Sequence, residues 1–437
     1  MSAAALGASV SRSAGGFLDV FLEARPEPGG SAGSARQMLT YNGLMPGPTL
    51  ETRAGDTLRL RLKNSLSEAT NLHFHGLHVS PIGNADNPFL SAPPGEILEY
   101  EVKIPDNHPG GTFWYHPHLH GTTARQVFGG LSGLIIVRGE LDSLPEIASS
   151  DEQLLILKDF SFDRTGRIHD ANPMERIQGR EGNVITVNGK TMPFFAIQRN
   201  GLTRFRALNA SASRYYRLRV EEHPMAIIAT DGGALPRVDW VEDLLVVPGQ
   251  RAEFLIQGIR SPGVYRILSL PYDRGSMGMG GGSAAASTVL AQLAYLGSSD
   301  TNFPVPDQLP DVAPLPMPTE PARTFYLEER MMGFQINGRA FDANRIDTVV
   351  RLETLEDWEL INLSGMDHPF HVHTNAFQLV DSGGLAERAW RDVVNVPRGT
   401  RRRIRLRFSD YTGRTVYHCH ILDHEDLGMM GTLRIGN

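Results

Sequence analysis

The sequence predicts an all-β protein built from three related β-sandwich domains, and three observations support this fold class. Short runs rich in β-branched and apolar residues, separated by Gly, Pro and Asn, recur along the chain, whereas long amphipathic helical patterns are scarce. Related motifs occur at three places along the chain, which indicates an internal repeat. At 437 residues the chain is also too long for one typical hydrophobic core.

The clearest strand candidates are six short apolar runs: Thr57 to Lys63, Ile97 to Ile104, Leu134 to Arg138, Leu154 to Lys158, Leu244 to Val247 and Arg402 to Phe408. The last run and the residue before it carry five arginines around Ile404 and Leu406. Since side chains alternate between the two faces of a strand, we interpret Arg401, Arg402, Arg403, Arg405 and Arg407 as a solvated strand face and not as a nucleic-acid patch.

The repeat is marked by Asn-Gly turns and by a later asparagine. The segment from Tyr41-Asn42-Gly43 to Lys63-Asn64 is echoed by that from Ile336-Asn337-Gly338 to Ile361-Asn362, and more weakly by that from Val187-Asn188-Gly189 to Leu208-Asn209. Histidine pairs follow only the two outer copies, and a proline-rich stretch at 303–321 is typical of a stiff linker. We therefore predict domains at 1–142, 143–302 and 303–437, with a copper-free spacer in the middle.

Composition excludes several other classes of protein. The net charge is −7 and no lysine-rich tail is present, so we expect no nucleic-acid binding. No apolar run is long enough to span a membrane. The single cysteine, Cys419, excludes an intramolecular disulfide. Residues 1–16 do not form a complete secretion signal, yet we expect a periplasmic or extracellular monomer.

Histidine pairs are the strongest functional signal in the chain. Random placement of 15 histidines in 437 residues gives about half of one His-x-His pair. The chain has five, namely His73/His75, His116/His118, His118/His120, His371/His373 and His418/His420. On a strand both members of a pair face the same side and can bind one metal or two adjacent metals. Because the pairs belong to the outer repeats, a shared site must lie between the first and third domains.

A second kind of metal site surrounds Cys419. On a strand, the Cys419 side chain points away from those of His418 and His420, so the two sites would be joined by a few covalent bonds. Together with His368, His424 and Met429, Cys419 provides two imidazoles, a thiolate and a thioether, which is the ligand set of a blue-copper site. This set favours copper over a tetrahedral zinc site.

At these residues the chain resembles the multicopper oxidases, and most closely three-domain bacterial laccases. The matching segments are 73–76, 116–118, 368–373 and 418–429, with further similarity at 112–121, 271–275 and 365–373. The resemblance covers the whole chain. It implies three cupredoxin-like Greek-key β-sandwich domains and four copper ions per chain, one of type 1, one of type 2 and two of type 3.

The resemblance also implies a role for each ligand. It assigns the type 1 copper to His368, Cys419, His424 and axial Met429, since the family spacing selects Met429 and not Met430. It assigns the type 2 copper to His73 and His371, and the type 3 pair to His75, His116, His118, His373, His418 and His420. Asp86 and Glu425 match acids linked to proton delivery. For His78, His108, His120, His169 and His223 we expect ordinary hydrogen-bonded roles.

The reaction implied by the resemblance is the one-electron oxidation of phenols or aromatic amines, coupled to reduction of dioxygen to water. One alternative is a cuprous oxidase, which would bind Cu(I) through extra methionines and acids. Met277 and Met279 fall short of the methionine-rich insertion of such enzymes, although Met331, Met332, Met366 and Asp367 could form a small copper patch. A non-catalytic cupredoxin scaffold is disfavoured by the complete ligand set, and a copper nitrite reductase by the paired histidines.

Overall fold

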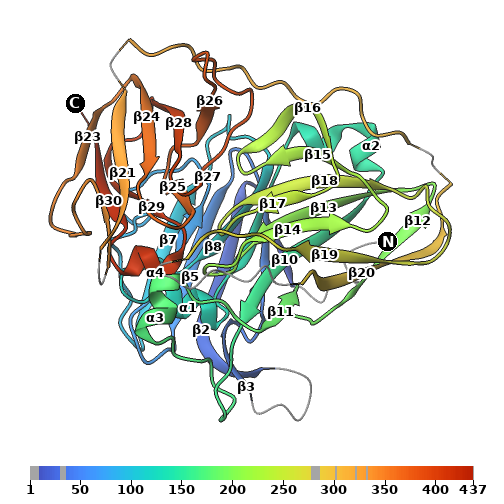
Figure 1. Ribbon diagram of the computed structural model, residues 1–437, viewed down its shortest axis with the longest axis horizontal. Helices are drawn as coiled ribbons and strands as arrows, with labels where there is room; N and C mark the ends of the chain where they lie inside the picture. The colour runs from blue at the N-terminus through green and yellow to red at the C-terminus, as the bar shows by residue number, and fades with distance from the viewer. Residues whose placement is uncertain are drawn as a thin grey trace.

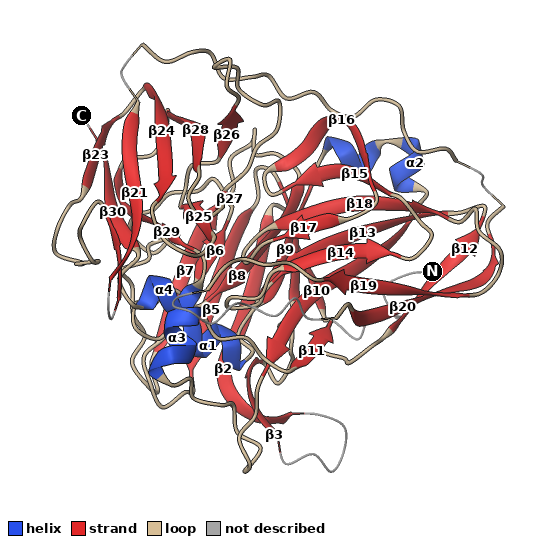
Figure 2. Cartoon of the chain, in the orientation of Figure 1, coloured by secondary structure: helices blue, strands red, loops and turns tan. Residues whose placement is uncertain are grey.

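The computed structural model describes residues 9–29, 36–276, 286–300, 303–319, 322–330 and 333–436. Within these residues, strands form six sheets that pair into three sandwiches, and helices are few and short (Figure 2). The sandwiches follow one another along the chain, coloured from blue through green and yellow to red in Figure 1. The predicted all-β class with three cupredoxin-like domains is confirmed.

The first sandwich pairs a sheet of strand order β3-β2-β5-β7 with a sheet of order β1-β4-β9-β8-β6. A short helix, α1, lies between β8 and β9. The elements are β1 (Val10–Arg12), β2 (Phe17–Gly29), β3 (Arg36–Tyr41), β4 (Thr49–Arg53), β5 (Thr57–Asn64), β6 (His73–His75), β7 (Ile97–Lys103), β8 (Gly111–His116), α1 (Thr123–Gly129) and β9 (Gly133–Arg138).

The second sandwich pairs a sheet of order β11-β10-β13-β18-β15-β16 with one of order β12-β20-β19-β14-β17. A 3₁₀ turn at Glu140–Ser143 precedes it. Its elements are α2 (Pro145–Ala148), β10 (Asp151–Phe160), α3 (Pro173–Gln178), β11 (Val184–Val187), β12 (Phe194–Arg199), β13 (Leu202–Asn209), β14 (Tyr216–Val220), β15 (Met225–Thr230), β16 (Gly233–Val241), β17 (Leu244–Val246), β18 (Arg251–Gln257), β19 (Val264–Leu270) and β20 (Thr288–Ser298).

The third sandwich pairs a sheet of order β22-β21-β24-β28-β26 with one of order β23-β30-β29-β25-β27. A short helix, α4, separates its last two strands. The elements are β21 (Arg323–Arg330), β22 (Gly333–Ile336), β23 (Thr348–Arg351), β24 (Thr354–Asn362), β25 (His368–Val372), β26 (Phe377–Val380), β27 (Val393–Val396), β28 (Arg401–Phe408), β29 (Gly413–Cys419), α4 (Leu422–Asp426) and β30 (Met430–Gly436).

The Asn-Gly turns found in the sequence occupy equivalent positions in the three sandwiches. Each asparagine has a φ between 52° and 57°, a left-handed conformation that asparagine tolerates better than most residues. In each case the side-chain amide donates to a backbone carbonyl of the first long strand, as Asn42 does to Phe21, Asn188 to Leu154 and Asn337 to Thr324. The sequence repeat is therefore a structural repeat.

All six predicted strand runs are strands, but the interpretation of the arginine run is wrong at one position. Arg401, Arg402, Arg403 and Arg407 are exposed, whereas Arg405 is buried. The Arg405 guanidinium donates to both carboxylate oxygens of Asp357 on the neighbouring strand, at 2.7 and 3.0 Å. This two-point ion pair compensates for the loss of water, so the charge is tolerated inside the sandwich.

Chain segments from neighbouring sandwiches connect their cores. Tyr215 and Val247 of the second sandwich pack into the core of the third. The linker takes an extended path from the second sandwich to the third (Figure 1). Its Leu309 packs into the second core, and the backbone amide of Leu315 donates to Gln378 of the third sandwich.

A buried ionic network joins the first two sandwiches. Glu253 of β18 accepts hydrogen bonds from Arg204 and Arg206 of β13, and from the Thr112 hydroxyl of β8 in the first sandwich at 2.6 Å. Glu253 and both arginines are almost inaccessible to water. Burial raises the pKa of Glu253, but the two arginines outweigh it, so the pKa lies below its usual value.

We expect Glu253→Ala to lower the free energy of unfolding by about 3–5 kcal/mol, because it leaves two buried guanidinium groups short of a partner. Denaturant titration of the copper-free protein measures this. Glu359→Ala is the matched control, since it breaks a pair with Arg401, whose side chain is 74% exposed, and we expect a loss below about 1 kcal/mol. Equal losses in both variants would contradict the role of the network.

Candidate metal centres

Eight histidines from the first and third sandwiches meet in one buried region. In the first sandwich, His73 of β6 pairs in register with His116 of β8. In the third, His371 of β25 pairs with His418 of β29. Each pair thus places imidazoles side by side on one sheet. The remaining four lie two residues further along, and all eight side chains are buried, namely His73, His75, His116, His118, His371, His373, His418 and His420.

The ring nitrogens of these histidines form three groups, each containing residues from both sandwiches. Within a group, the candidate ligand atoms all lie within 4.8 Å of one another. His73 and His371 approach with their Nε2 atoms 3.3 Å apart. The Nε2 atoms of His118 and His418 are 3.0 Å apart. The groups are His73, His75 and His371; His75, His116 and His420; and His118, His373 and His418.

Hydrogen bonds on the outer side of the rings determine which nitrogen faces the centre. The Nδ1 atom of His116 donates to the Pro117 carbonyl at 2.8 Å. The Nδ1 atom of His371 donates to the carbonyl of Asp392 at 2.7 Å. Since a neutral imidazole carries one proton, each of these rings presents the lone pair of Nε2 to the group.

The donor set fits copper. Burial lowers the pKa of His73, His75, His116 and His371, and therefore favours the neutral form of these rings that binds metal. Buried ring nitrogens without a hydrogen-bond partner include His75 Nδ1, His116 Nε2 and both nitrogens of His420. Because unpaired buried polar atoms are costly, lone pairs that converge in this way indicate metal coordination.

Apart from these three imidazole groups, His368, Cys419 and His424 form another group, which we call the thiolate group. All three of its side chains are fully buried. The Nδ1 atom of His368 lies 3.3 Å from Cys419 Sγ, and that of His424 lies 3.9 Å from it. The outer nitrogens are occupied, since His368 Nε2 contacts the Ser364 hydroxyl at 2.7 Å and His424 Nε2 donates to the Ile177 carbonyl at 3.0 Å. Both Nδ1 atoms therefore face the sulfur.

Burial raises the pKa of the Cys419 thiol. A thiol in this environment loses its proton only if a metal cation stabilises the thiolate, which a soft ion such as copper does. Met429 is also fully buried and hydrogen bonded by its backbone to Cys419 and His424. The thioether of Met429 is therefore in the same core as the thiolate.

The strand alternation expected at the end of the chain is present. Cys419 belongs to the thiolate group, whereas His418 and His420 belong to two different imidazole groups. The thiolate group and the imidazole groups are thus connected by the main chain of three consecutive residues.

Helix α4 carries His424 and is held by the other two sandwiches. The Asp423 carboxylate accepts from the Arg180 guanidinium of the second sandwich at 2.7 Å. The Asp426 carboxylate accepts from the backbone amides of Gly121 and Ala124 of the first sandwich, at 2.7 and 2.8 Å. Helices α1, α3 and α4, one from each sandwich, consequently lie together, below strands β6, β25 and β29 in the view of Figure 2. This arrangement fixes the position of the segment 418–429.

Asp86 and Glu425, the two predicted proton-delivery acids, are fully buried beside the imidazoles. Asp86 accepts from His73 Nδ1 at 2.9 Å and from the Phe74 amide at 2.9 Å. Burial raises the pKa of Asp86 to about 7. Glu425 lies 3.1 Å from His418 Nδ1 and 3.6 Å from His118 Nε2. Burial raises its pKa too, but these rings outweigh burial and the pKa is lowered.

The other singled-out histidines have hydrogen-bonded or packing roles. His78 and His108 bond the Asp410 carboxylate and the Pro109 carbonyl, while His169 and His223 bond Glu175 and Tyr295. His120 packs against the ring of Phe341. Of the proposed methionine patch, Met366 and Asp367 are buried. Met277, Met279, Met331 and Met332 lie outside the described residues.

Sequence reasoning missed the residues that hold the ligands from outside. These include Asp392, which accepts from His75 Nε2 at 2.9 Å, and Arg251, which pairs with Asp392. They also include Ile177, whose backbone carbonyl binds His424. For Asp392 the sequence gives only a weak signal, since this acid stands directly before the largely apolar run 393–396. A main-chain contact such as that of Ile177 has no signal in a single sequence.

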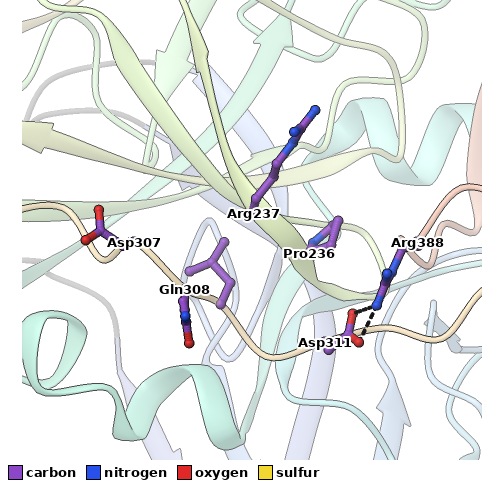
Figure 3. Close-up of a pocket in the computed structure, with 7 residues that line it drawn as sticks. Pro236, Arg237, Asp307, Gln308, Asp311 and Arg388 are labelled. Atoms are coloured by element: carbon purple, nitrogen blue, oxygen red, sulfur yellow. Dashed lines mark hydrogen bonds and ion pairs between the residues drawn. The ribbon is translucent and has the colours of Figure 1, made fainter.

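A surface hollow of about 590 Å³ lies between β16, the linker and the third sandwich (Figure 3). The ion pair between Arg388 and Asp311 crosses one side of it. Its lining residues are Pro236, Arg237, Asp307, Gln308, Leu309, Asp311 and Arg388. None of these is a candidate metal ligand, so the hollow is separate from the metal centres.

Comparison with known proteins gives a consistent result. Three family models, each described as multicopper oxidase, match residues 27–142, 164–297 and 313–437. A multicopper oxidase from Staphylococcus haemolyticus is 30% identical over 410 residues, covering 91% of this chain and 84% of that protein.

Two solved structures are similar over nearly the whole chain. A multicopper oxidase from Campylobacter jejuni, described as a metallo-oxidase, has a TM-score of 0.88 at 32% identity and covers 98% of this chain and 96% of its own. A bacterial laccase-like multicopper oxidase from Ochrobactrum, described as active towards lignin model compounds and lignosulfonate, has a TM-score of 0.83 at 28% identity, covering 98% and 99%.

We expect Asp86 to make the copper-free protein less stable as the pH rises. Its pKa of about 7 in the folded protein exceeds the ~3.9 of an unfolded chain, so between these values the folded state binds more protons. The free energy of unfolding then falls by up to ~1.4 kcal/mol per pH unit in this window. Asp86→Asn should remove that contribution in urea titrations at pH 5 and pH 7. An unchanged pH dependence in the variant would contradict the assignment.

Proposed function

Because the chain belongs to the multicopper oxidase family, we propose that it is a laccase-type oxidase. It couples four one-electron oxidations of a phenol or aromatic amine to the reduction of one dioxygen to two waters, with uptake of four protons. The observation that carries this proposal is the buried thiolate group directly next to a buried cluster of eight imidazoles. A non-catalytic scaffold would have no need of this complete donor set.

Twelve residues would hold the four copper ions. The type 1 copper would be held by His368, Cys419, His424 and Met429, and the type 2 copper by His73 and His371. The type 3 pair would be held by His75, His116, His118, His373, His418 and His420. Copper bound at these positions supplies one-electron redox chemistry and the binding of dioxygen.

The protein connects the thiolate group to the imidazole groups and excludes water from the histidine cluster. Cys419 is covalently linked through the main chain to His418 and His420, so electrons accepted at the thiolate group have a short bonded path to the imidazole groups. Burial of every ring keeps bulk water away from the cluster. A dry and preorganised site limits the loss of reactive oxygen species and the reorganisation during electron transfer.

Proton delivery is the second contribution of the chain. We assign this role to Asp86 and Glu425, which contact two different rings of the cluster, His73 and His418. A carboxyl group such as Asp86, whose pKa is raised to about 7 by burial, can hold and release a proton near neutral pH. Reduction of dioxygen requires protons inside this water-poor region.

The second candidate function is oxidation of Cu(I). It is favoured by the covering of the thiolate group, since neither His368 nor His424 exposes a ring edge to solvent. Helix α3 covers His424, whose Nε2 donates to the Ile177 carbonyl. A cover of this kind hinders close contact with a bulky phenol more than with a small donor. The relative from Campylobacter jejuni, described as a metallo-oxidase, is consistent with this candidate.

The cellular setting follows from the proposed reaction. We propose a monomer that works in the periplasm or outside the cell, where phenols, aromatic amines and copper are met. In the part of the chain that the structure describes, no helix is long and apolar enough to cross a membrane.

The proposed function predicts an intense blue absorption and dioxygen uptake with a phenol once the protein is loaded with copper. Cys419→Ser should lose the colour and nearly all of the uptake, because an alcohol does not replace the thiolate as a copper ligand. Met430→Leu, a volume-conserving change next to the proposed axial ligand, is the control and should keep both. Wild-type uptake in the serine variant would disprove the assignment.

Substrate choice gives a separate prediction. If the α3 cover limits contact with His424, a small phenol should have a kcat/KM at least roughly tenfold above that of a bulky multi-ring phenol of similar reduction potential, which is ~1.4 kcal/mol in the barrier. Steady-state dioxygen uptake measures both donors. Cu(I) in the same assay decides between the two candidates, since a cuprous oxidase would oxidise Cu(I) with a higher kcat/KM than either phenol.

A further inference from the structure

Asp392, which directly precedes β27, contacts two histidines of the cluster. Its carboxylate Oδ1 accepts from His75 Nε2 at 2.9 Å, across the boundary to the first sandwich. Its backbone carbonyl accepts from His371 Nδ1 at 2.7 Å within the third sandwich. The His75 and His371 rings are stacked, with centroids 3.8 Å apart and an angle of 11° between their planes. One residue therefore holds a stacked pair of rings.

Arg251, the first residue of β18 in the second sandwich, holds the Asp392 carboxylate in place. Its Nη1 and Nη2 atoms donate to the two carboxylate oxygens at 2.7 and 2.6 Å. Its other donors bind the carbonyl of Thr112 in the first sandwich at 2.9 Å and that of Asp231 at 2.9 Å. The two-point ion pair and these carbonyls leave the fully buried guanidinium and carboxylate little freedom to rotate.

The chain makes room for this ion pair beside His75. Gly76 has a φ of +86°, and a Cβ atom at this position would lie 2.3 Å from Arg251 Nη2 and 2.6 Å from Asp392 Oδ2. Any side chain at residue 76 would therefore collide with the pair. Arg251 and Asp392 occupy space that only a glycine next to the ligand provides.

The hydrogen bond from His75 to Asp392 distinguishes this ring from its neighbours. Where Nε2 carries the proton, Nδ1 carries the lone pair, and His75 Nδ1 is buried without a hydrogen-bond partner. In four other rings the hydrogen-bonded nitrogen is Nδ1 and not Nε2, namely in His73, His116, His371 and His418. His75 thus faces the cluster with its other ring nitrogen, and Asp392 selects that orientation.

We propose that Asp392, held by Arg251, is a positioning residue that determines the tautomer and ring orientation of His75 and thereby completes one type 3 copper position. The inference rests on the proposed copper ligand set. It gives the second sandwich a part in building the cluster, because the clamp requires Arg251 from the second sandwich, Asp392 from the third and His75 from the first. Copper binding at this position then depends on correct docking of all three.

Asp392→Asn tests the proposal, because an amide can donate to His75 Nε2 and shift the ring proton to Nδ1. In the copper-free protein we expect the imidazole ¹⁵N chemical shifts of His75 to change to those of the Nδ1–H tautomer. After loading, we expect elemental mass spectrometry to show a loss of at least one of the four proposed copper equivalents. The blue absorption should stay, since Asp392 does not touch His368, Cys419 or His424.

Asp357→Asn is the matched control. It weakens the pair between Arg405 and Asp357, which is also buried, two-point and located in the third sandwich, but which touches no histidine. We expect a comparable drop in thermal stability with a full copper complement and an unchanged His75 tautomer. A copper loss equal to that of Asp392→Asn would show that the effect is merely structural and would overturn the proposal.

The outcomes separate this inference from the proposed function. If the wild-type chain fails to bind four coppers, the proposed function is wrong. If it binds four and Asp392→Asn binds four as well, with the wild-type tautomer of His75, the positioning role is wrong. Should Asp392→Asn not fold, Arg251→Lys keeps the charge and removes the two-point clamp. Partial copper loss in that variant would support the proposal, and a full complement with the wild-type tautomer would overturn it.

Discussion

The structure depends on one constraint, the convergence of eight buried imidazoles at the boundary between two β-sandwiches. Each ring is buried, and burial lowers the pKa of most of them because a dry interior disfavours the imidazolium ion. Several ring nitrogens, such as His75 Nδ1 and His116 Nε2, are buried without a hydrogen-bond partner. The arrangement is unfavourable as bare protein and favourable as a metal site, so the fold and copper binding support one another.

Holding these rings together requires that three sandwiches dock with little freedom. Charged groups fix the docking at positions where apolar contacts alone would allow the sandwiches to shift relative to one another. Glu253 joins the first two sandwiches, Asp423 and Arg180 join the last two, and Asp426 accepts from backbone amides at the start of α1 and just before it. Buried ion pairs contribute little net stability compared with apolar packing, but they strongly disfavour any docking that leaves them unpaired. Their value here is the specificity of the assembly.

The same constraint explains the separation of tasks along the segment 418–426. Alternate residues of one strand face two different environments, so the thiolate group and the imidazole groups are neighbours without sharing space. Short helix α4 then returns His424 to the thiolate while Glu425 faces His418. In the proposed oxidase, electron acceptance, dioxygen reduction and proton supply would lie side by side, because Cys419, His418 and Glu425 belong to one short segment and face different groups.

Much of this arrangement could be predicted from the sequence because it is encoded locally. The period of two in the strands, the Asn-Gly turns and the His-x-His pairs each depend on residues close together in the chain, and they determined the β class, the repeat and the list of candidate ligands. The arginine run shows the limit of local patterns, since Arg405 is buried only because Asp357 lies opposite it on another strand.

What only the tertiary structure decided is how distant segments meet. The grouping of the histidines, the orientation of the His75 ring and the burial of His424 beneath α3 depend on contacts between residues more than a hundred positions apart. Arg251 has no pattern of its own in the sequence and Asp392 has only a weak one, because an ion pair across a domain boundary is defined by docking and not by spacing along the chain. The candidate ligands could therefore be predicted from the sequence, whereas their grouping was decided by the packing of three sandwiches.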